Sequence, residues 1–273
     1  MSPAKQVPQE IAVLIVDAFT ALPFRGNSAG VVLLETPREE SWMQALAMEL
    51  NHPETAFLVP EGDSYHLRWF TPTREVDLCG HATMASAHAL WEMGRLSGRS
   101  PVRFRTRSGP LTARKHAGGI EMDFPAQPAT AVAPADVPAG LAEALGTTWN
   151  YLGWNGTDYL IELESEEAVR ALAPDFARLA SIGSRGFIVT AACDSPYDFV
   201  SRFFAPAFGI NEDPVTGSAH CCLGPYWAAK VGKNQLVGYQ ASARGGTVKV
   251  TVRGDRCTLM GTAVTVLKGI LAG

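Results

Sequence analysis

Two glycines, each followed by a polar residue, could hold a small anion. Gly80-His81 and Gly217-Ser218 each follow a short turn and open a stretch with helical character. The first backbone N–H groups of a helix have no partner within it, and the aligned peptide dipoles favour negative charge there. A carboxylate is a natural occupant, so the pattern predicts a small carboxylate-bearing substrate bound at both turns.

Two carboxylates could act on such a substrate. Glu54 lies between a helix stopped by Asn51 and Pro53 and an apolar strand at residues 56–59. Burial there would raise its pKa towards the range that general acid–base catalysis needs near neutral pH. A solvated loop carboxylate is the commoner role for Glu54, and Asp213 before Pro214 could equally be a turn former or a helix cap. Only the convergence of these groups with His81 and Ser218 favours chemistry.

The elements that position these residues occur twice along the chain. Residues 80–91 carry no acidic or basic charge, which predicts an enclosed central helix that ends in a left-handed cap near Gly94. A shift of 137 positions places identical residues on one another, namely Gly80 on Gly217, Arg107 on Arg244 and Gly109 on Gly246. A repeat of half the chain indicates two similar domains. We place them at residues 1–125 and 126–262, and expect residues 263–273 to form a strand that returns to the first half.

Two local patterns predict helix boundaries. Thr36-Pro37-Arg38-Glu39 has the form of a capping box with proline at the first helical position. Pro225 lies within the stretch from Ser218 to about Val231, so we expect a kink or a late start in that helix.

Composition narrows the class of protein. The 273 residues are 47% hydrophobic and 18% charged with a net charge of −4, so no basic face indicates nucleic-acid binding. No uninterrupted apolar run reaches the roughly 18 residues that a membrane span needs. Five cysteines without a Cys-x-x-Cys pair indicate neither a disulfide framework nor a zinc ribbon. We therefore expect a cytoplasmic enzyme without membrane or nucleic-acid partners.

A set of motifs in order along the chain resembles the PhzF-like phenazine-biosynthesis family. They are Gly26-Asn27-Ser28-Ala29, Asn51-His52-Pro53-Glu54-Thr55, Phe70-Thr71-Pro72, Cys79-Gly80-His81-Ala82-Thr83, Ser201-Arg202-Phe203-Phe204-Ala205-Pro206 and Glu212-Asp213-Pro214-Val215-Thr216-Gly217-Ser218-Ala219. The resemblance extends over residues 17 to 262. It implies an α+β protein of diaminopimelate epimerase-like fold, with two pseudo-symmetric halves. Each half would be a curved, mostly antiparallel sheet around a central helix, with the site in the cleft between them.

The resemblance also implies an activity. Members of the family isomerise small carboxylic acids by proton transfer without a cofactor, and Glu54 matches the glutamate that moves the proton. His81, Asp213 and Ser218 match the residues that support it and the substrate. A homodimer is implied by the phenazine-making members. Those members carry proline where this chain has Ala82, so their substrate is not implied.

Cys79 admits a second mechanism. Diaminopimelate epimerases use two thiols, each before a glycine at the start of a central helix; here Cys79 stands at the first position and Thr216 at the second. A two-thiol racemase is therefore excluded. The helix N-terminus could lower the pKa of Cys79, but we favour a small buried cysteine without a chemical role.

Other constellations are weaker. His81 and His88 would share a helix face, but no third ligand is evident, so we expect no metal. No Gly-x-Gly-x-x-Gly or Walker-type loop predicts a nucleotide cofactor. Two alternatives stay open, namely a catalytically idle metabolite-binding or scaffold protein of the same fold and a hydrolase that uses Cys79 with His81 as its base.

Overall fold

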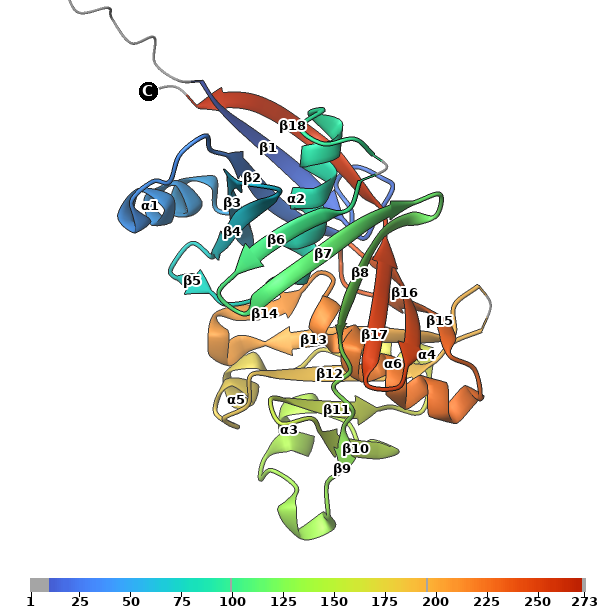
Figure 1. Cartoon of the computed structure of the whole chain (residues 1–273). Helices are drawn as coiled ribbons and strands as arrows, with labels where there is room; N and C mark the ends of the chain where they lie inside the picture. Colours follow the sequence, from blue (N-terminus) through green and yellow to red (C-terminus); the bar gives the residue numbers. More distant parts are fainter. Residues whose placement is uncertain (1–9, 99, 195, 272–273) are drawn as a thin grey trace, which may run out of the picture.

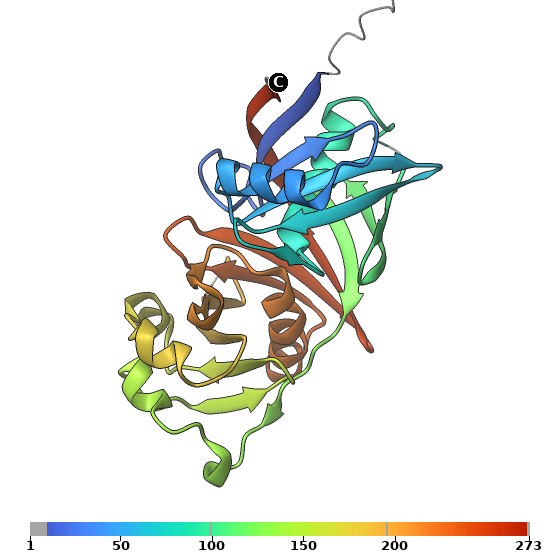
Figure 2. The ribbon, with the colours of Figure 1, turned by 90° about the vertical axis from the view of Figure 1, so that its left-hand side faces the viewer.

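The computed structural model of the chain describes residues 10–98, 100–194 and 196–271, which form two lobes (Figures 1 and 2). The first lobe contains β1 (Ile11–Ala18), β2 (Asn27–Leu33), α1 (Glu40–Leu50), β3 (Glu54–Glu61), β4 (Ser64–Phe70), β5 (Glu75–Val76), α2 (Gly80–Glu92), β6 (Val102–Thr106), β7 (Gly109–His116) and β8 (Gly119–Pro125). Then follow β9 (Thr130–Ala131), η1 (Pro134–Asp136), α3 (Leu141–Leu145), β10 (Tyr151–Trp154), β11 (Asp158–Glu162), α4 (Glu166–Ala171), α5 (Phe176–Ala180), β12 (Gly186–Ala192) and β13 (Phe199–Ala205). The chain continues with η2 (Pro206–Phe208), β14 (Ile210–Asp213), α6 (Gly217–Val231), β15 (Gln235–Gln240), β16 (Gly246–Arg253), β17 (Arg256–Gly261) and β18 (Ala263–Leu271).

The two lobes have the same order of strand pairing. In the first, β1–β2 is antiparallel, β2–β3 parallel, β3–β4 antiparallel, β4–β6 parallel, and β6–β7–β8 antiparallel. In the second, β10–β11, β11–β12, β12–β13, β13–β15 and β15–β16–β17 repeat these directions in the same order. Antiparallel pairing of β8 with β17 joins the two sheets. The predicted α+β fold with two pseudo-symmetric, mostly antiparallel halves is confirmed.

The last strand of each lobe pairs with the sheet of the other lobe. After β8 the chain forms β9, which pairs with β10 of the second lobe. After β17 it forms β18, which pairs along the whole of β1 in the first lobe, from Ile11 opposite Leu271 to Ala18 opposite Ala263. Figure 1 shows β18 beside β1, at the far end of the molecule from β9. The exchange is reciprocal, whereas the domain limits at residues 125 and 262 stay a prediction.

The two central helices are enclosed. Helix α2 contacts β1, β2, β3, β7, β8 and β18, and its first three turns are almost entirely buried. It ends before Gly94, whose φ of 66° provides the expected left-handed cap. Helix α6 packs on β15, β16 and β17 and touches α2. One hydrophobic core formed by both helices and both sheets therefore spans the two lobes.

Pro225 lies inside α6, and the alternative of a late helix start is wrong. Proline has no N–H to give to the carbonyl four residues earlier. That carbonyl, of Cys221, instead accepts a hydrogen bond from the backbone N–H of Gln127 at 3.0 Å. The Cys221 carbonyl, which has no helical donor because of Pro225, thus accepts a hydrogen bond from the segment that connects the two lobes.

Outer helices cover the remaining sheet faces. Helix α1 packs over β3 and β4, and α3, α4 and α5 cover the second lobe. The capping box predicted at Thr36 is wrong, because α1 begins at Glu40 and the carbonyl of Glu39 accepts the first N–H groups, from Trp42 and Met43. Among the described residues, no helix combines the length and apolarity needed to cross a membrane.

Candidate active site

The helix starts at Gly80 and Gly217 face each other at the boundary between the lobes. A Cβ placed on Gly80 would lie 3.8 Å from the Cα of Gly217, and the reverse distance is the same. These are ordinary contacts, and neither glycine has a positive φ. Neither the backbone nor the protein packing therefore requires glycine here. A side chain at either position would extend towards the start of the other helix, across the junction of the two lobes.

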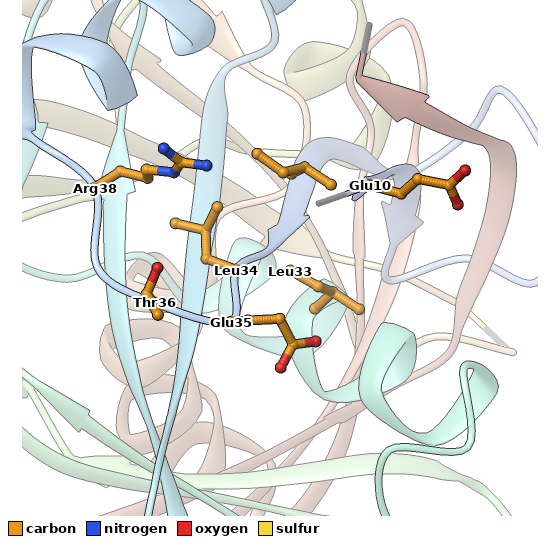
Figure 3. A pocket seen from close by; sticks show the side chains of 7 residues that line it. Glu10, Leu33, Leu34, Glu35, Thr36 and Arg38 are labelled. Atoms are coloured by element: carbon orange, nitrogen blue, oxygen red, sulfur yellow. The ribbon is translucent and has the colours of Figure 1, made fainter. Parts of the chain in front are cut away.

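A cleft of about 850 Å³ opens at this meeting point. All the residues that the sequence singled out lie on its wall: Glu54, Gly80, His81, Asp213, Gly217 and Ser218. A second hollow, of only about 10 Å³, lies at the end of β2, where Glu10 and Glu35 point away from Arg38 (Figure 3). The second hollow holds no more than a water, so the cleft is the candidate site.

Glu54 is the first residue of β3 and its carboxyl group is only 14% exposed. Helix α1 ends at Asn51 in a left-handed conformation, and this sharp connection turns the chain so that Glu54 enters the cleft. Burial raises the pKa of Glu54 to about 8, the nearby charge of Asp213 adds to the rise, and a hydrogen bond from the Cys79 thiol opposes it. Glu54 can therefore hold or release a proton close to neutral pH.

His81 and Cys79 surround this carboxyl group. His81 Nε2 lies 3.2 Å from Glu54 Oε2, and Cys79 Sγ lies 3.5 Å from His81 Nδ1. Burial lowers the pKa of His81 to about 3, against a smaller opposite effect of the Ser28 backbone carbonyl. The imidazole is thus neutral and can share a hydrogen bond with Glu54 in either protonation state.

Cys79 is buried, as we favoured from the sequence, and its surroundings decide its pKa. Burial, with the adjacent Glu54, raises the pKa of the thiol well above its usual value, so the alternative of a pKa lowered by the helix N-terminus is wrong. Cys79 nevertheless lies beside Glu54 and His81. One possible metal-ligand atom from each of Glu54, Cys79 and His81 lies within 4.8 Å of the other two. His81 therefore has two neighbours that could bind a metal ion with it. His88 is not among them, because it contacts Thr265 on β18.

Asp213, at the end of β14, is held as a hydrogen-bond acceptor. Its Oδ1 accepts from Asn27 Nδ2 at 2.8 Å, and its Oδ2 accepts from the Thr216 hydroxyl. Burial raises the pKa of Asp213 to about 6, while these two donors and the charge of Arg185 oppose the rise. Asp213 is therefore mainly ionised at neutral pH. Asn27 comes from the other lobe, so this residue of the Gly26-Asn27-Ser28-Ala29 motif holds the carboxylate across the boundary between the lobes.

Arg185 lies on the cleft wall and was missed by the sequence analysis. Its guanidinium is held by the buried carboxylate of Asp158, with Nε donating to Oδ1 at 2.8 Å, and Nη2 lies 3.2 Å from the Ser218 hydroxyl. The side chain stays 38% exposed. The internal repeat held a signal for it, since a shift of 130 positions aligns residues 54–59 with residues 184–189 and places Arg185 on Thr55, next to Glu54. The positive charge of Arg185 thus lies in the second lobe, close to the position that corresponds to Glu54 of the first lobe.

Comparison with known proteins agrees with this fold. The family described as phenazine biosynthesis-like protein matches residues 16–269. An uncharacterized isomerase of Halalkalibacterium halodurans is 53% identical over 261 residues, which are 95% of this chain and 97% of that protein.

Solved structures give the same result. A crystal structure of a PhzF-family phenazine biosynthesis protein from Enterococcus faecalis is 42% identical, with a TM-score of 0.92 over 97% of this chain and 100% of that one. A hydroxyproline epimerase from Agrobacterium vitis, at 12% identity, shares the fold alone, with a TM-score of 0.60 over 97% of this chain and 93% of that one. The chain belongs to the phenazine biosynthesis-like, or PhzF, family.

Proposed function

We propose that this protein is an isomerase that moves a proton within a small carboxylate-bearing metabolite held in the cleft, without a cofactor. Curated relatives that are named isomerases support the reaction class. The observation that carries the mechanism is the carboxyl group of Glu54, which has a pKa raised to about 8 and lies on the same cleft wall as two converging helix N-termini. The first feature suits proton transfer near neutral pH and the second suits an anionic substrate.

The substrate carboxylate would be held by the helix starts. Backbone N–H groups of Gly80 and His81 on one side, and of Gly217 and Ser218 on the other, donate to its oxygens. Arg185 adds a permanent positive charge next to Ser218. Because glycine carries no side chain, the carboxylate can approach the backbone of both helix starts closely.

Glu54 would remove a proton from a substrate carbon and return it to another carbon on the same face. In the first step the C–H bond breaks, an O–H bond forms on Glu54, and the electron pair moves into the conjugated system of the substrate. In the second step the pair takes the proton back at its new position. Neutral His81 orients the Glu54 carboxyl through their 3.2 Å contact, and the charge of Asp213 favours its protonated form.

A racemase would need a second acid on the opposite face. Thr216 occupies the position that mirrors Cys79, and a hydroxyl is a poor acid. Arg185 cannot titrate in the physiological range either. The residues present therefore favour one base that serves both proton transfers over two opposed bases.

The test is uptake of solvent deuterium by a panel of small carboxylic acids, with parent and Glu54→Gln protein. The amide keeps the shape and hydrogen bonding of Glu54 but cannot accept a proton, so labelling and turnover should fall by about 100- to 10,000-fold. Glu49→Gln, the same change at an exposed position of α1, is the matched control and should leave both unchanged. A Glu54→Gln protein within threefold of the parent would sink the mechanism. A parent that binds these acids but labels none would favour the idle metabolite-binding protein.

Two further properties stay predictions. The family resemblance implies a homodimer, and a monomeric mass by light scattering at micromolar concentration would contradict it. A cytoplasmic location follows from the composition and cysteine pattern, and fractionation of cells that express the chain would check it.

A further inference from the structure

Three side chains on one wall of the cleft form a closed triangle of possible metal ligands. His81 Nε2 lies 3.2 Å from Glu54 Oε2 and 3.9 Å from Cys79 Sγ, and the Cys79 thiol donates a hydrogen bond to Glu54. Across the described part of the chain, no other three histidine, cysteine or acidic side chains bring one ligand atom each within 4.8 Å of one another. One nitrogen, one sulfur and one oxygen thus lie around a common point.

The size of this triangle fits a tetrahedral zinc ion. Zn²⁺ binds imidazole nitrogen and carboxylate oxygen at about 2.0 to 2.2 Å and thiolate sulfur at about 2.3 Å. Two such ligands at a tetrahedral angle are about 3.4 to 3.6 Å apart. The two sides of 3.2 and 3.9 Å differ from this range by a few tenths of an ångström. The site can therefore close around such an ion through movements of side chains alone.

The ligand types select the kind of ion. Sulfur, imidazole nitrogen and a single carboxylate oxygen suit Zn²⁺ and similar soft cations, whereas Mg²⁺ and Ca²⁺ need several oxygen ligands. The surrounding charge also favours a cation, because the negative charge of Asp213 acts on Glu54. A dication next to Glu54 relieves this repulsion.

The three ligands can be reached from solvent. Glu54, Cys79 and His81 all line the cleft, although each side chain is mostly buried. The protein supplies three ligands, so the fourth position of a tetrahedral ion is left to water or to a small molecule in the cleft. This is the form of an open zinc site rather than a closed structural one.

We propose that Glu54, Cys79 and His81 form a site for Zn²⁺ or a cation of the same kind, and that its occupation reversibly blocks proton transfer. On binding, the S–H bond of Cys79 breaks, a bond from sulfur to the metal forms, and the proton is released to solvent. A carboxylate bound to a dication is a much weaker base, so Glu54 can no longer take a proton from carbon. The metal-free protein is then the active form. The loss of activity rests on the proposed function, whereas the metal site does not.

Cobalt tests the site without knowledge of the substrate. Co²⁺ accepts the same tetrahedral ligands as Zn²⁺ but absorbs visible light, and a thiolate ligand adds a charge-transfer band in the near ultraviolet. In the parent both signals should saturate at one Co²⁺ per chain, and Zn²⁺ but not Mg²⁺ should displace the ion. Cys79→Ser should abolish the thiolate band. Glu54→Gln should keep the band and weaken binding at least about tenfold, since even groups behind the ligands contribute that much.

Two control variants each change an incomplete set of ligands elsewhere. The Cys193 thiol donates to Glu166 Oε2 at 2.7 Å, and His88 Nε2 lies 3.6 Å from Glu92 Oε2. Neither pair has a third ligand of this kind close by among the described residues. Cys193→Ser and His88→Gln should therefore leave the affinity for Co²⁺ and the thiolate band as they are in the parent.

Several results would overturn the metal site. One is a parent that gives no thiolate band at any Co²⁺ concentration. Another is a band that survives in Cys79→Ser or disappears in Cys193→Ser, since the ion would then be bound elsewhere. If Cys79→Ser does not fold, Glu54→Gln decides alone, and an unchanged affinity for Co²⁺ in that variant overturns the site.

Activity separates the blocking role from the proposed function. Zn²⁺ should stop the deuterium labelling of any acid that the metal-free parent labels, and EDTA should restore it. Unchanged labelling by the zinc-saturated parent would overturn the blocking role. A metal-free parent that labels no acid, or an active Glu54→Gln protein, would instead remove the proposed function and leave the cobalt result standing.

Discussion

The sharpest consequence of the site is the dependence of activity on pH in the parent and in Asp213→Asn. Glu54 must be ionised to accept a proton from carbon, and burial with the charge of Asp213 raises its pKa to about 8. At pH 7 roughly one molecule in ten then carries the reactive carboxylate, and at pH 6 about one in a hundred. We expect kcat/KM to rise about tenfold per pH unit below pH 8 and to level off above it.

Replacing Asp213 by asparagine removes one of the two causes of the raised pKa. The amide is nearly the same size and can still accept a hydrogen bond from Asn27, but it carries no charge. The pKa of Glu54 should fall, and the rising limb of the profile should move to lower pH. Asp213→Asn will also lower the maximum rate if the carboxylate contacts the substrate, so the measured quantity is the position of the limb after normalisation to the plateau.

The assay is the initial rate of deuterium incorporation from buffered heavy water between pH 5 and 10, at substrate concentrations well below KM. Glu212→Gln is the matched control, because it removes a neighbouring carboxylate that is paired with Arg202. It should leave the limb where the parent has it. A limb that stays in place or moves to higher pH in Asp213→Asn would refute the electrostatic coupling between the two carboxyl groups.

The remaining predictions concern neighbouring groups. Cys79→Ala should retain turnover within about threefold, because general acid–base steps contribute far more than that; total loss in a folded variant would mean that the thiol is an acid or base. Arg185→Gln should raise KM for a carboxylate substrate about tenfold with a smaller change in kcat, since a charged hydrogen bond is lost, and Arg185→Lys should recover part of it; unchanged KM values would contradict the role of Arg185. Glu54→Gln should change the pH dependence of the free energy of unfolding. The pKa of Glu54 is about 8 in the folded protein against 4.5 for a free carboxyl group, so between these values the folded parent holds a proton that the unfolded chain has lost. The stability of the parent therefore falls relative to that of the variant as the pH rises from 4.5 to 8, by up to about 1.4 kcal/mol per pH unit. Urea unfolding of both proteins at pH 6 and 8 measures this, and parallel changes would exclude it.

The central helices were predictable from sequence because their physical signal is local. Residues 80–91 carry no acidic or basic charge, and only an enclosed helix tolerates such a stretch on all faces. Glu54 was singled out by the family resemblance, and the residues that stop α1 and the apolar strand that follows explain why it lies at a buried corner. In both cases the neighbours in sequence are also the neighbours that decide the environment.

Strand β15 was not predicted because its packing partner is distant. It contains a glycine, which lowers the strand signal. A Cβ on Gly238 would lie 2.4 Å from the ring of Phe199, which comes from β13. Glycine is thus required there by an aromatic ring that only the folded chain brings close.

The same reason explains the errors at the site. Arg185 was not singled out, because Asp158, which holds it, is 27 positions away in the chain. The helix N-terminus alone suggested a lowered Cys79 pKa as one alternative, and the burial that outweighs it is visible only in the fold. Sequence motifs therefore located Glu54, but not the electrostatic environment that three separate segments create around it.

The reciprocal exchange of β9 and β18 says something about the origin of the chain. Two identical subunits that each gave their last strand to the other would have this connectivity after end-to-end fusion of their genes. In such an ancestor both helix starts would have been the same, and the cleft would have been symmetric. After fusion each copy could change alone, which allowed Glu54 to remain on one side while a guanidinium, Arg185, came to occupy the other. Joining two equal halves in one polypeptide thus permits the asymmetry that the proposed one-base reaction requires.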